Sequence, residues 1–285
     1  MTLISSTNGK GFGSEFVNPK SSSIAKAFKT ESESSWLLQD FRKSAVPDLL
    51  TEANVSWIDG DAAVQALAEH KIATVQKVTE YVTRPAARIL ENYRFATAGG
   101  WIAYGSTLDG ELAQVPYFKP IEPRQEPRDG KLRVIKYETP AGMSALPLLP
   151  FVDEATAQAI YARYGVQPEE GEGFWDVVWR CDLPVAITEG LKKALALIAH
   201  GMPAIALRGI TQWHLKGSDE LHQVVAHFAT PGRVLYIVFD VDERPQVIRD
   251  IRRQVLRLGS VLEQRSCKVF APMWDYEQGK GVDDV

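Results

Sequence analysis

The sequence predicts an α/β protein, in which a Rossmann-type parallel four-stranded sheet follows a mixed α+β N-terminal region. From about residue 176, short apolar runs alternate with amphipathic segments in the order β-α-β-α-β-α-β. This alternation is typical of parallel strands joined by helical crossovers. Near residue 93, helical periodicity gives way to short β-rich runs. We therefore expect a disordered tail over 1–34, an α+β domain over 35–175 and an α/β domain over 176–285.

The composition is typical of a globular protein with a sizeable core. Of 285 residues, 45% are hydrophobic and 24% charged, and the formal net charge is −4, so any nucleic-acid contact must use a local basic surface. No apolar run approaches the roughly 20 residues of a membrane span, and the chain does not start like a signal peptide, so we expect a cytoplasmic protein without membrane contact. The two cysteines, Cys181 and Cys267, lack CxxC partners, which excludes a cysteine-rich zinc ribbon.

The N-terminal region divides into a tail, a helical part and a β-rich part. The tail is rich in Ser, Gly, Asn, Lys and Thr and has no periodicity, which indicates disorder. Apolar residues recur at helical spacing between 36 and 92. Three β-rich runs then predict a small antiparallel sheet. The region is completed by a loop rich in Pro and charge, a helix and an acidic linker. These segments lie at 101–104, 114–118 and 132–137 (runs), 120–131 (loop), 155–164 (helix) and 167–173 (linker).

The C-terminal region shows four buried strands with helices between them. Gly201 fits the position just after the first helix, Ser218 is able to cap the second, and Pro245 suits the first turn of the third. Asp219 and Glu220 would then lie in the first turn of the second helix. The predicted strands are 184–188, 202–207, 233–239 and 267–271.

Acidic residues follow two of these strands at the edge where ligands bind in open parallel sheets. Glu189 follows one strand, and Asp240 and Asp242 follow another. Alternation along the strand places the two aspartates on the same side, where they are suited to hold Mg²⁺. Glu189 then remains available to move a proton. The alternative is that these acids are helix caps or solvated turn residues, and the spacing alone leaves both open.

Four segments together resemble a TOPRIM domain, the catalytic fold of bacterial-type primases, topoisomerases and some nucleases. They are TEGLKKALAL at 188–197, AIALRG at 204–209, FDVD at 239–242 and KGVDD at 280–284. Upstream segments resemble the region that precedes TOPRIM in plasmid and phage replication proteins. They are Tyr93-Arg-Phe, Trp101, Lys119-Pro, Pro123-Arg124 and IKYETP at 135–140. Over roughly residues 36–285 the chain is similar to the DUF3854 family, a TOPRIM-like domain of plasmid replication-initiation proteins.

The resemblance implies roles for the acids. Glu189 would be the general acid/base, and Asp240 and Asp242 would bind Mg²⁺, with Mn²⁺ as an alternative. Asp283 and Asp284 match a late acidic motif, and a solvated acidic terminus is the other interpretation.

The resemblance also implies that the chain is a plasmid DNA replication protein with a Mg-dependent nucleotidyltransferase or primase-like module. Its partners would be single-stranded or origin DNA, nucleotides, and a helicase or ATPase in cis or in trans. A non-catalytic DNA-binding replication-initiation module and a TOPRIM nuclease are the alternatives. Two departures weaken the enzymatic interpretation: the chain cannot form the zinc ribbon usual in such primases, and it stops at Val285, immediately after the Asp-Asp motif, as a fragment or a reduced protein would.

Basic residues of the N-terminal domain are the candidate DNA contacts. Such a strip would track a phosphate backbone, and Trp101, Tyr117 and Tyr137 would offer stacking faces, whereas the alternative is a solvated loop. The basic residues are Arg124, Lys131, Arg133 and Lys136, with Lys119 and Arg128 nearby. Lys192 and Lys193 begin the helix after Glu189 and would reach a phosphate at its N-terminus, or are ordinary surface lysines.

Overall fold

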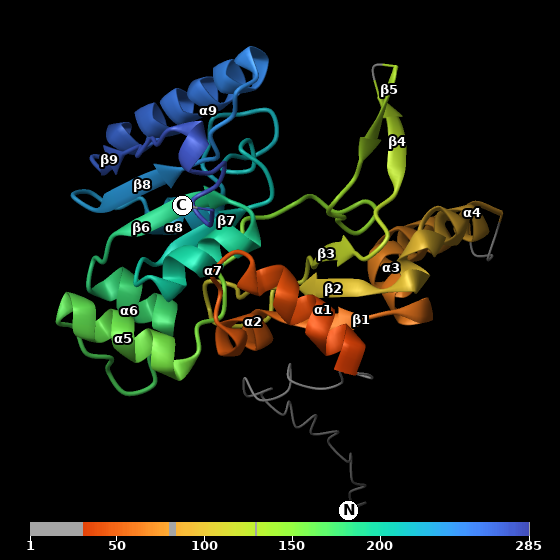
Figure 1. The fold of residues 1–285 in the computed structure, drawn as a ribbon, viewed down its shortest axis with the longest axis horizontal. Helices are drawn as coiled ribbons and strands as arrows, with labels where there is room; N and C mark the ends of the chain where they lie inside the picture. The colour runs from red at the N-terminus through yellow and green to blue at the C-terminus, as the bar shows by residue number, and fades with distance from the viewer. Residues whose placement is uncertain (1–30, 80–83, 129, 285) are drawn as a thin grey trace, which may run out of the picture.

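A computed structural model describes residues 31–79, 84–128 and 130–284. Figure 1 shows a parallel sheet with its helices beside a smaller antiparallel sheet, from which a hairpin projects. The predicted disordered tail lies outside the described residues up to residue 30, and residues 31–34 belong to the first helix. Within the described part of the chain, no helix has the length and apolar character needed to cross a membrane.

The N-terminal region contains helices and one strand where only helices were predicted. A short strand, β1, lies inside residues 36–92 and pairs antiparallel with β2. Its sequence Val-Ser-Trp-Ile favours a strand, and it begins where the Asn54 side chain ends α2 by bonding Leu50 O and the backbone of Phe151. The elements are α1 (Glu31–Arg42), α2 (Asp48–Asn54), β1 (Val55–Ile58), α3 (Gly60–Thr79), α4 (Arg84–Asn92) and the 3₁₀ helix η2 (Arg94–Ala98).

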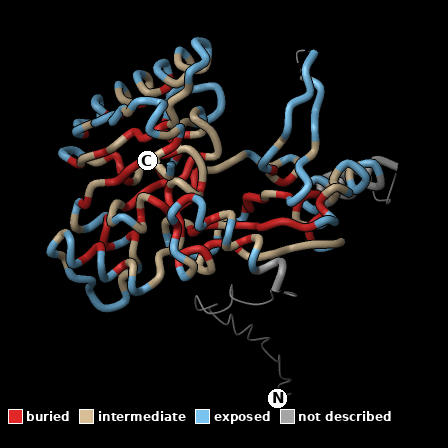
Figure 2. Tube along the Cα trace, viewed as in Figure 1, coloured by how far each residue is buried: buried red, intermediate tan, exposed pale blue. Residues whose placement is uncertain are grey.

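The β-rich region forms two separate sheets. Strands β2 (Gly100–Ala103) and β3 (Tyr117–Pro120) complete the order β1-β2-β3. Strands β4 (Gln125–Arg128) and β5 (Lys131–Val134) form a hairpin, so the predicted loop over 120–131 is wrong for β4. Cross-strand pairing with β5 makes β4 a strand despite Pro127. The hairpin stands clear of the body and is almost wholly exposed (Figures 1 and 2).

The predicted parallel four-stranded sheet is confirmed, with the strand order β7-β6-β8-β9. Ile187, Ile205 and Ile237 are aligned across the adjacent strands β7, β6 and β8 and are buried, which explains the largely apolar sequences of these strands. The elements are β6 (Val185–Glu189), α7 (Leu191–Ala199), β7 (Ala204–Leu207), α8 (Gln223–Phe228), β8 (Val234–Val238), α9 (Pro245–Gln264), β9 (Lys268–Phe270) and the 3₁₀ helix η3 (Tyr276–Gln278).

The second helix of this region begins later than predicted. Ser218 does not cap it, because α8 starts at Gln223 and His222 accepts the bond from Val224 N. Leu221 is instead held in a β-bridge with His214, which keeps the preceding residues out of the helix.

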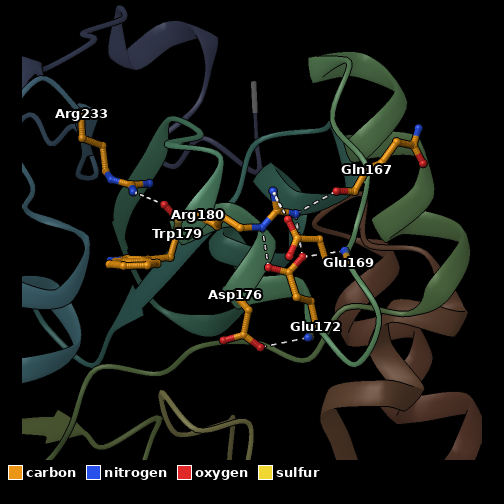
Figure 3. A network of polar contacts seen from close by, with 8 residues as sticks. Gln167, Glu169, Glu172, Asp176, Trp179, Arg180 and Arg233 are labelled. Atoms are coloured by element: carbon orange, nitrogen blue, oxygen red, sulfur yellow. Dashed lines mark hydrogen bonds and ion pairs between the residues drawn. The ribbon is translucent and has the colours of Figure 1, made fainter.

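Two helices, α5 (Glu154–Tyr164) and α6 (Phe174–Arg180), connect the two regions. Figure 3 shows Arg180 between the carboxylates of Glu172 and Glu169, which closes the acidic linker into a compact loop. Buried Arg233 donates to the carbonyls of Val178, Trp179 and Leu183 and so satisfies the C-terminal end of α6.

One hydrophobic core crosses the predicted domain boundary at 175/176. It contains Phe41 and Trp101 from the N-terminal region together with Leu191 and Ile187 from the parallel sheet and its helix. Leu148 also exchanges two backbone hydrogen bonds with Ala206, beside the outer strand β7. The two regions therefore pack as one unit through a shared apolar interior.

Asp40, on α1, is the polar centre of this packing. Its carboxylate accepts from Lys119 Nζ at 2.7 and 2.8 Å and from Trp101 Nε1 at 3.0 Å. Lys192 Nζ lies 2.6 Å from Asp40 Oδ1 and donates to the Asp40 carbonyl. Burial alone raises the pKa of Asp40, but these donors outweigh it and lower the pKa. Asp40 thus joins α1 to the small sheet and to α7.

We expect Asp40→Asn to lower the free energy of unfolding by about 3 kcal/mol, because it leaves two largely buried ammonium groups without their counter-charge. Urea denaturation measures this. Asp48→Asn is the matched control: it removes an exposed pair with Arg42 and should cost less than about 1 kcal/mol. Equal losses in the two variants would show that Asp40 does not hold the regions together.

The interaction of Asp40 with its buried donors also predicts that the free energy of unfolding depends on pH. Because the folded-state pKa of Asp40 lies below its usual 3.8, the carboxylate contributes its full stability above that value. The contribution is lost as the pH falls through the folded-state pKa. The difference in unfolding free energy between wild type and Asp40→Asn should therefore shrink on acidification below pH 3.8 and stay constant above about pH 5.

Candidate functional site

The carboxyl end of β6 places Glu189 at the edge of the parallel sheet. Glu189 is the last residue of the strand, and Gly190 follows with φ +91°, a conformation that favours glycine. Gly190 N donates to Leu207 O at 2.7 Å, which fixes the turn against β7. This turn lets α7 begin at once, with Lys192 and Lys193 in its first turn.

Asp240 and Asp242 lie beyond the end of their strand and have different partners. Because β8 ends at Val238, the predicted strand alternation that would place both carboxylates on one side does not apply. Asp240 Oδ1 lies 3.2 Å from Lys193 Nζ. Asp242 accepts from Arg244 at 2.7 and 2.8 Å, and Lys280 Nζ lies 3.6 Å from it.

The late acidic motif also divides between two roles. Asp283 Oδ1 lies 3.8 Å from Lys193 Nζ, so it belongs with Asp240 and Glu189 around that lysine. The Asp284 carboxylate accepts from Gly281 N at 2.9 Å and closes a turn. Val241 N donates to Lys280 O at 2.9 Å, which ties this terminal segment to the end of β8.

The pKa shifts follow from burial and from these pairings. Burial raises the pKa of Glu189, and the nearby Asp240 carboxylate raises it further. Burial also raises the pKa of Asp240, against the opposing effect of Lys193. Burial would lower the pKa of Lys193, but Asp240, Asp283 and Glu189 outweigh it and raise that pKa. The hydrogen bonds from Arg244 hold the pKa of Asp242 far below its usual value.

These residues do not fit a resident Mg²⁺ in this arrangement. Asp240 Oδ1 is buried without a hydrogen bond of good geometry, which suits a cation ligand. However, the Lys193 ammonium lies beside that oxygen, and both oxygens of Asp242 are taken by Arg244. The described residues include no group of three or more His, Cys, Asp or Glu side chains placed to hold a metal. The predicted pairing of Asp240 with Asp242 around one ion is not the observed geometry.

The candidate DNA contacts differ in what surrounds them. Lys131, Arg133 and Lys136 are exposed, on β5 and just after it. Arg124, at the base of the hairpin, is held by Glu138 at 2.6 and 3.1 Å and by Glu126. Lys192 is bound to Asp40, and Lys193 lies among the acids, so neither is an ordinary surface lysine.

Sequence reasoning missed Asp40 and Arg208. Arg208 follows β7 and donates to the carbonyls of Pro116, at 2.7 Å, and Val115, with its guanidinium 5.1 Å from the Tyr117 ring centre. Burial lowers its pKa to about 10. The sequence does carry a signal for Arg208. A polar residue followed by glycine, Arg208-Gly209, comes directly after β7, much as Glu189-Gly190 closes β6. Asp40 lies in an ordinary helical pattern, and nothing in its sequence context marks it.

Gly281 makes room for Lys193. An added Cβ would clash with Lys193 Cε and stand 2.5 Å from Asp283 Oδ1. We expect Gly281→Ala to lower the free energy of unfolding by about 1–3 kcal/mol through overpacking. Gly259→Ala is the control: its Cβ meets only Ile237 Cδ1 at 3.9 Å inside α9, so it should stabilise by up to about 1 kcal/mol. Thermal unfolding of both variants checks the opposite signs, and a neutral Gly281→Ala would contradict the tight packing.

Comparisons with known proteins place the C-terminal region in a family. The family model described as "Domain of unknown function (DUF3854)" matches residues 174–285. An uncharacterized protein of Picosynechococcus sp. is 30% identical over 256 residues, which covers 80% of this chain and 25% of the relative. The chain thus spans about a quarter of the length of that curated relative.

A comparison of three-dimensional structures also found a similar solved structure. It is a crystal structure of the Aquifex aeolicus primase, comprising the zinc-binding and RNA polymerase domains, with 11% identity and a TM-score of 0.47. The similarity covers 90% of this chain and 52% of that one. The family model starts at α6 and includes the whole parallel sheet, and its match over residues 174–285 agrees with the resemblance that the strand-end motifs carry.

Proposed function

We propose that this chain is a DNA-binding module of a plasmid replication-initiation protein, and that the β4–β5 hairpin and Tyr137 contact single-stranded DNA. The observation that carries the proposal is an exposed tyrosine at the end of an exposed basic strand, close to the acidic strand ends. The plasmid role rests on the resemblance to the DUF3854 family. From the same resemblance, we propose a helicase or ATPase, in cis or in trans, as the partner.

Tyr137 is suited to stack against a base. The residue is 36% exposed, and its ring lies nearly parallel to that of Tyr117, with ring centres 4.8 Å apart and planes at 15°. Trp101 packs against both rings, at 5.8 and 5.9 Å, which holds them in place. Burial, together with the carboxylates of Asp40, Asp283 and others, raises the pKa of Tyr137, so its phenol stays neutral. A rigid, partly exposed aromatic face binds bases without sequence preference.

The hairpin supplies the positive charge that leads to Tyr137. Lys131 and Arg133 are two residues apart on β5, so their side chains share one face, and Lys136 follows just before Tyr137. Glu126 stands opposite Arg133, but its carboxylate is paired with Arg124. A line of exposed cations of this kind attracts a phosphate backbone even though the whole chain is acidic.

Nucleotidyl transfer, as primer synthesis or strand cleavage, is the second candidate. The buried Asp240 Oδ1, which lacks a well-formed hydrogen bond beside Glu189, favours it. Mg²⁺ or Mn²⁺ bound there would neutralise phosphate charge. The arrangement of Lys193 and Arg244 around the acids favours the binding module instead.

A stacking contact predicts a large effect of Tyr137→Ala and a small one of Tyr137→Phe. The alanine variant should bind a labelled single-stranded oligonucleotide about fivefold to 150-fold more weakly, from the 1–3 kcal/mol typical of one stacked base. The phenylalanine variant keeps the ring and should stay within about twofold of wild type. Fluorescence anisotropy measures both, and equal affinities for the alanine variant and wild type would exclude the stacking role.

The basic strand predicts a change in salt dependence. Replacing Lys131, Arg133 and Lys136 by Gln should weaken binding and flatten the plot of log affinity against log salt by about 0.7 for each phosphate that is no longer neutralised. The matched control replaces three other exposed lysines, Lys43, Lys216 and Lys268, by Gln and changes the net charge equally. A weakening of the same size in the control would mean that the hairpin has no specific role.

The two candidate functions differ in their need for a metal. A binding module should hold the oligonucleotide equally well in EDTA and with Asp240→Asn, and primer-synthesis and plasmid-nicking assays with Mg²⁺ or Mn²⁺ should show no product. Product formation that disappears in Glu189→Gln would establish nucleotidyl transfer or cleavage instead.

A further inference from the structure

Lys193 occupies an unusual position for a cation. It lies in the first turn of α7, where the helix dipole is unfavourable to positive charge, and its side chain is only 20% exposed. Both features cost free energy, so a compensating interaction must hold the lysine there.

The compensation comes from three acids of separate segments. The ammonium lies 3.2 Å from Asp240 Oδ1, after β8, and 3.8 Å from Asp283 Oδ1, near the terminus. Glu189, at the end of β6, also interacts with it. Gly281 leaves the space that the lysine side chain fills. One cation therefore sits where the acids at the strand ends converge.

The neighbouring Lys192 shows that this placement is specific. It points away from the strand ends to Asp40 on α1, at 2.6 Å. Asp242 is likewise separate, since Arg244 and Lys280 neutralise it. Of these four cations, only Lys193 forms ion pairs with acids of two different segments, Asp240 and Asp283.

We propose that Lys193 is a built-in counter-ion that takes the place of a divalent cation among Glu189, Asp240 and Asp283. An ammonium at hydrogen-bonding distance from Asp240 Oδ1 and a divalent ion on the same oxygen repel each other strongly and cannot share the space. In the native chain the site therefore excludes the metal. Removal of the lysine charge lets these acids, which in the observed arrangement are not placed to hold a metal, close around a hard divalent cation.

The test measures Mn²⁺ binding to the whole chain. Electron paramagnetic resonance quantifies the ion that stays unbound. Lys193→Met keeps most of the side-chain volume and removes the charge, so it should bind Mn²⁺ at least about tenfold more tightly than wild type. Adding Asp240→Asn to Lys193→Met should abolish the gain. Lys193→Arg, which keeps the charge, and Lys216→Met, which removes an exposed charge elsewhere, should both stay at the wild-type level.

Two results would overturn the proposal. One is a Lys193→Met protein, folded by circular dichroism, that gains no Mn²⁺ affinity. The other is wild-type protein that already binds Mn²⁺ more tightly than Asp240→Asn does, since the lysine would then not exclude the ion. The second comparison needs no change at Lys193 and decides the question even if Lys193→Met does not fold. Neither readout depends on DNA binding, so failure of this proposal is distinguishable from failure of the proposed function.

Discussion

The Asp40 carboxylate joins three elements that are distant in sequence, and the placement of the candidate site follows from it. Asp40 lies on α1, its donors Trp101 and Lys119 on β2 and β3, and Lys192 on α7. A buried carboxylate is stable only when several donors satisfy it, so these elements must approach one another closely. As a result, the small sheet lies against the helix that starts at Glu189-Gly190, and Tyr137 comes to face the acids.

Two consecutive lysines then serve different acids because of helix geometry. Successive residues of an α-helix point about 100° apart, so Lys192 reaches toward α1 while Lys193 reaches toward the strand ends. The packing of the two regions and the charge balance of the site are therefore set by the same helical turn. This explains why the interface and the acidic site lie next to each other.

The apolar runs predicted the parallel sheet because β6 and β7 are buried on both faces and the inner positions of β8 are buried, as with Ile187, Ile205 and Ile237. Two short strands were missed: β4 has a weak local signal and depends on pairing with β5, whereas the four β-favouring residues of β1 lie between helices and pair with β2. The candidate site shows the same difference between interactions that are local in sequence and interactions that are not. Arg244 lies two residues from Asp242, a local pair, whereas the partner of Asp240 is Lys193, which lies far away in sequence. Which acids converge depends on the fold, and spacing alone does not determine it.

The charge balance at the strand ends bears on what the site does. Three carboxylates face the Lys193 ammonium, and the Lys280 ammonium also acts to lower the pKa values of Glu189 and Asp240. Burial, aided at Glu189 by the Asp240 carboxylate, raises the pKa values of Glu189 and Asp240. Both shifts act in the direction of the protonated acids. An internal lysine thus offsets part of the negative charge of the site without a metal ion, whereas a site that relies on a divalent ion leaves its acids uncompensated until the ion binds.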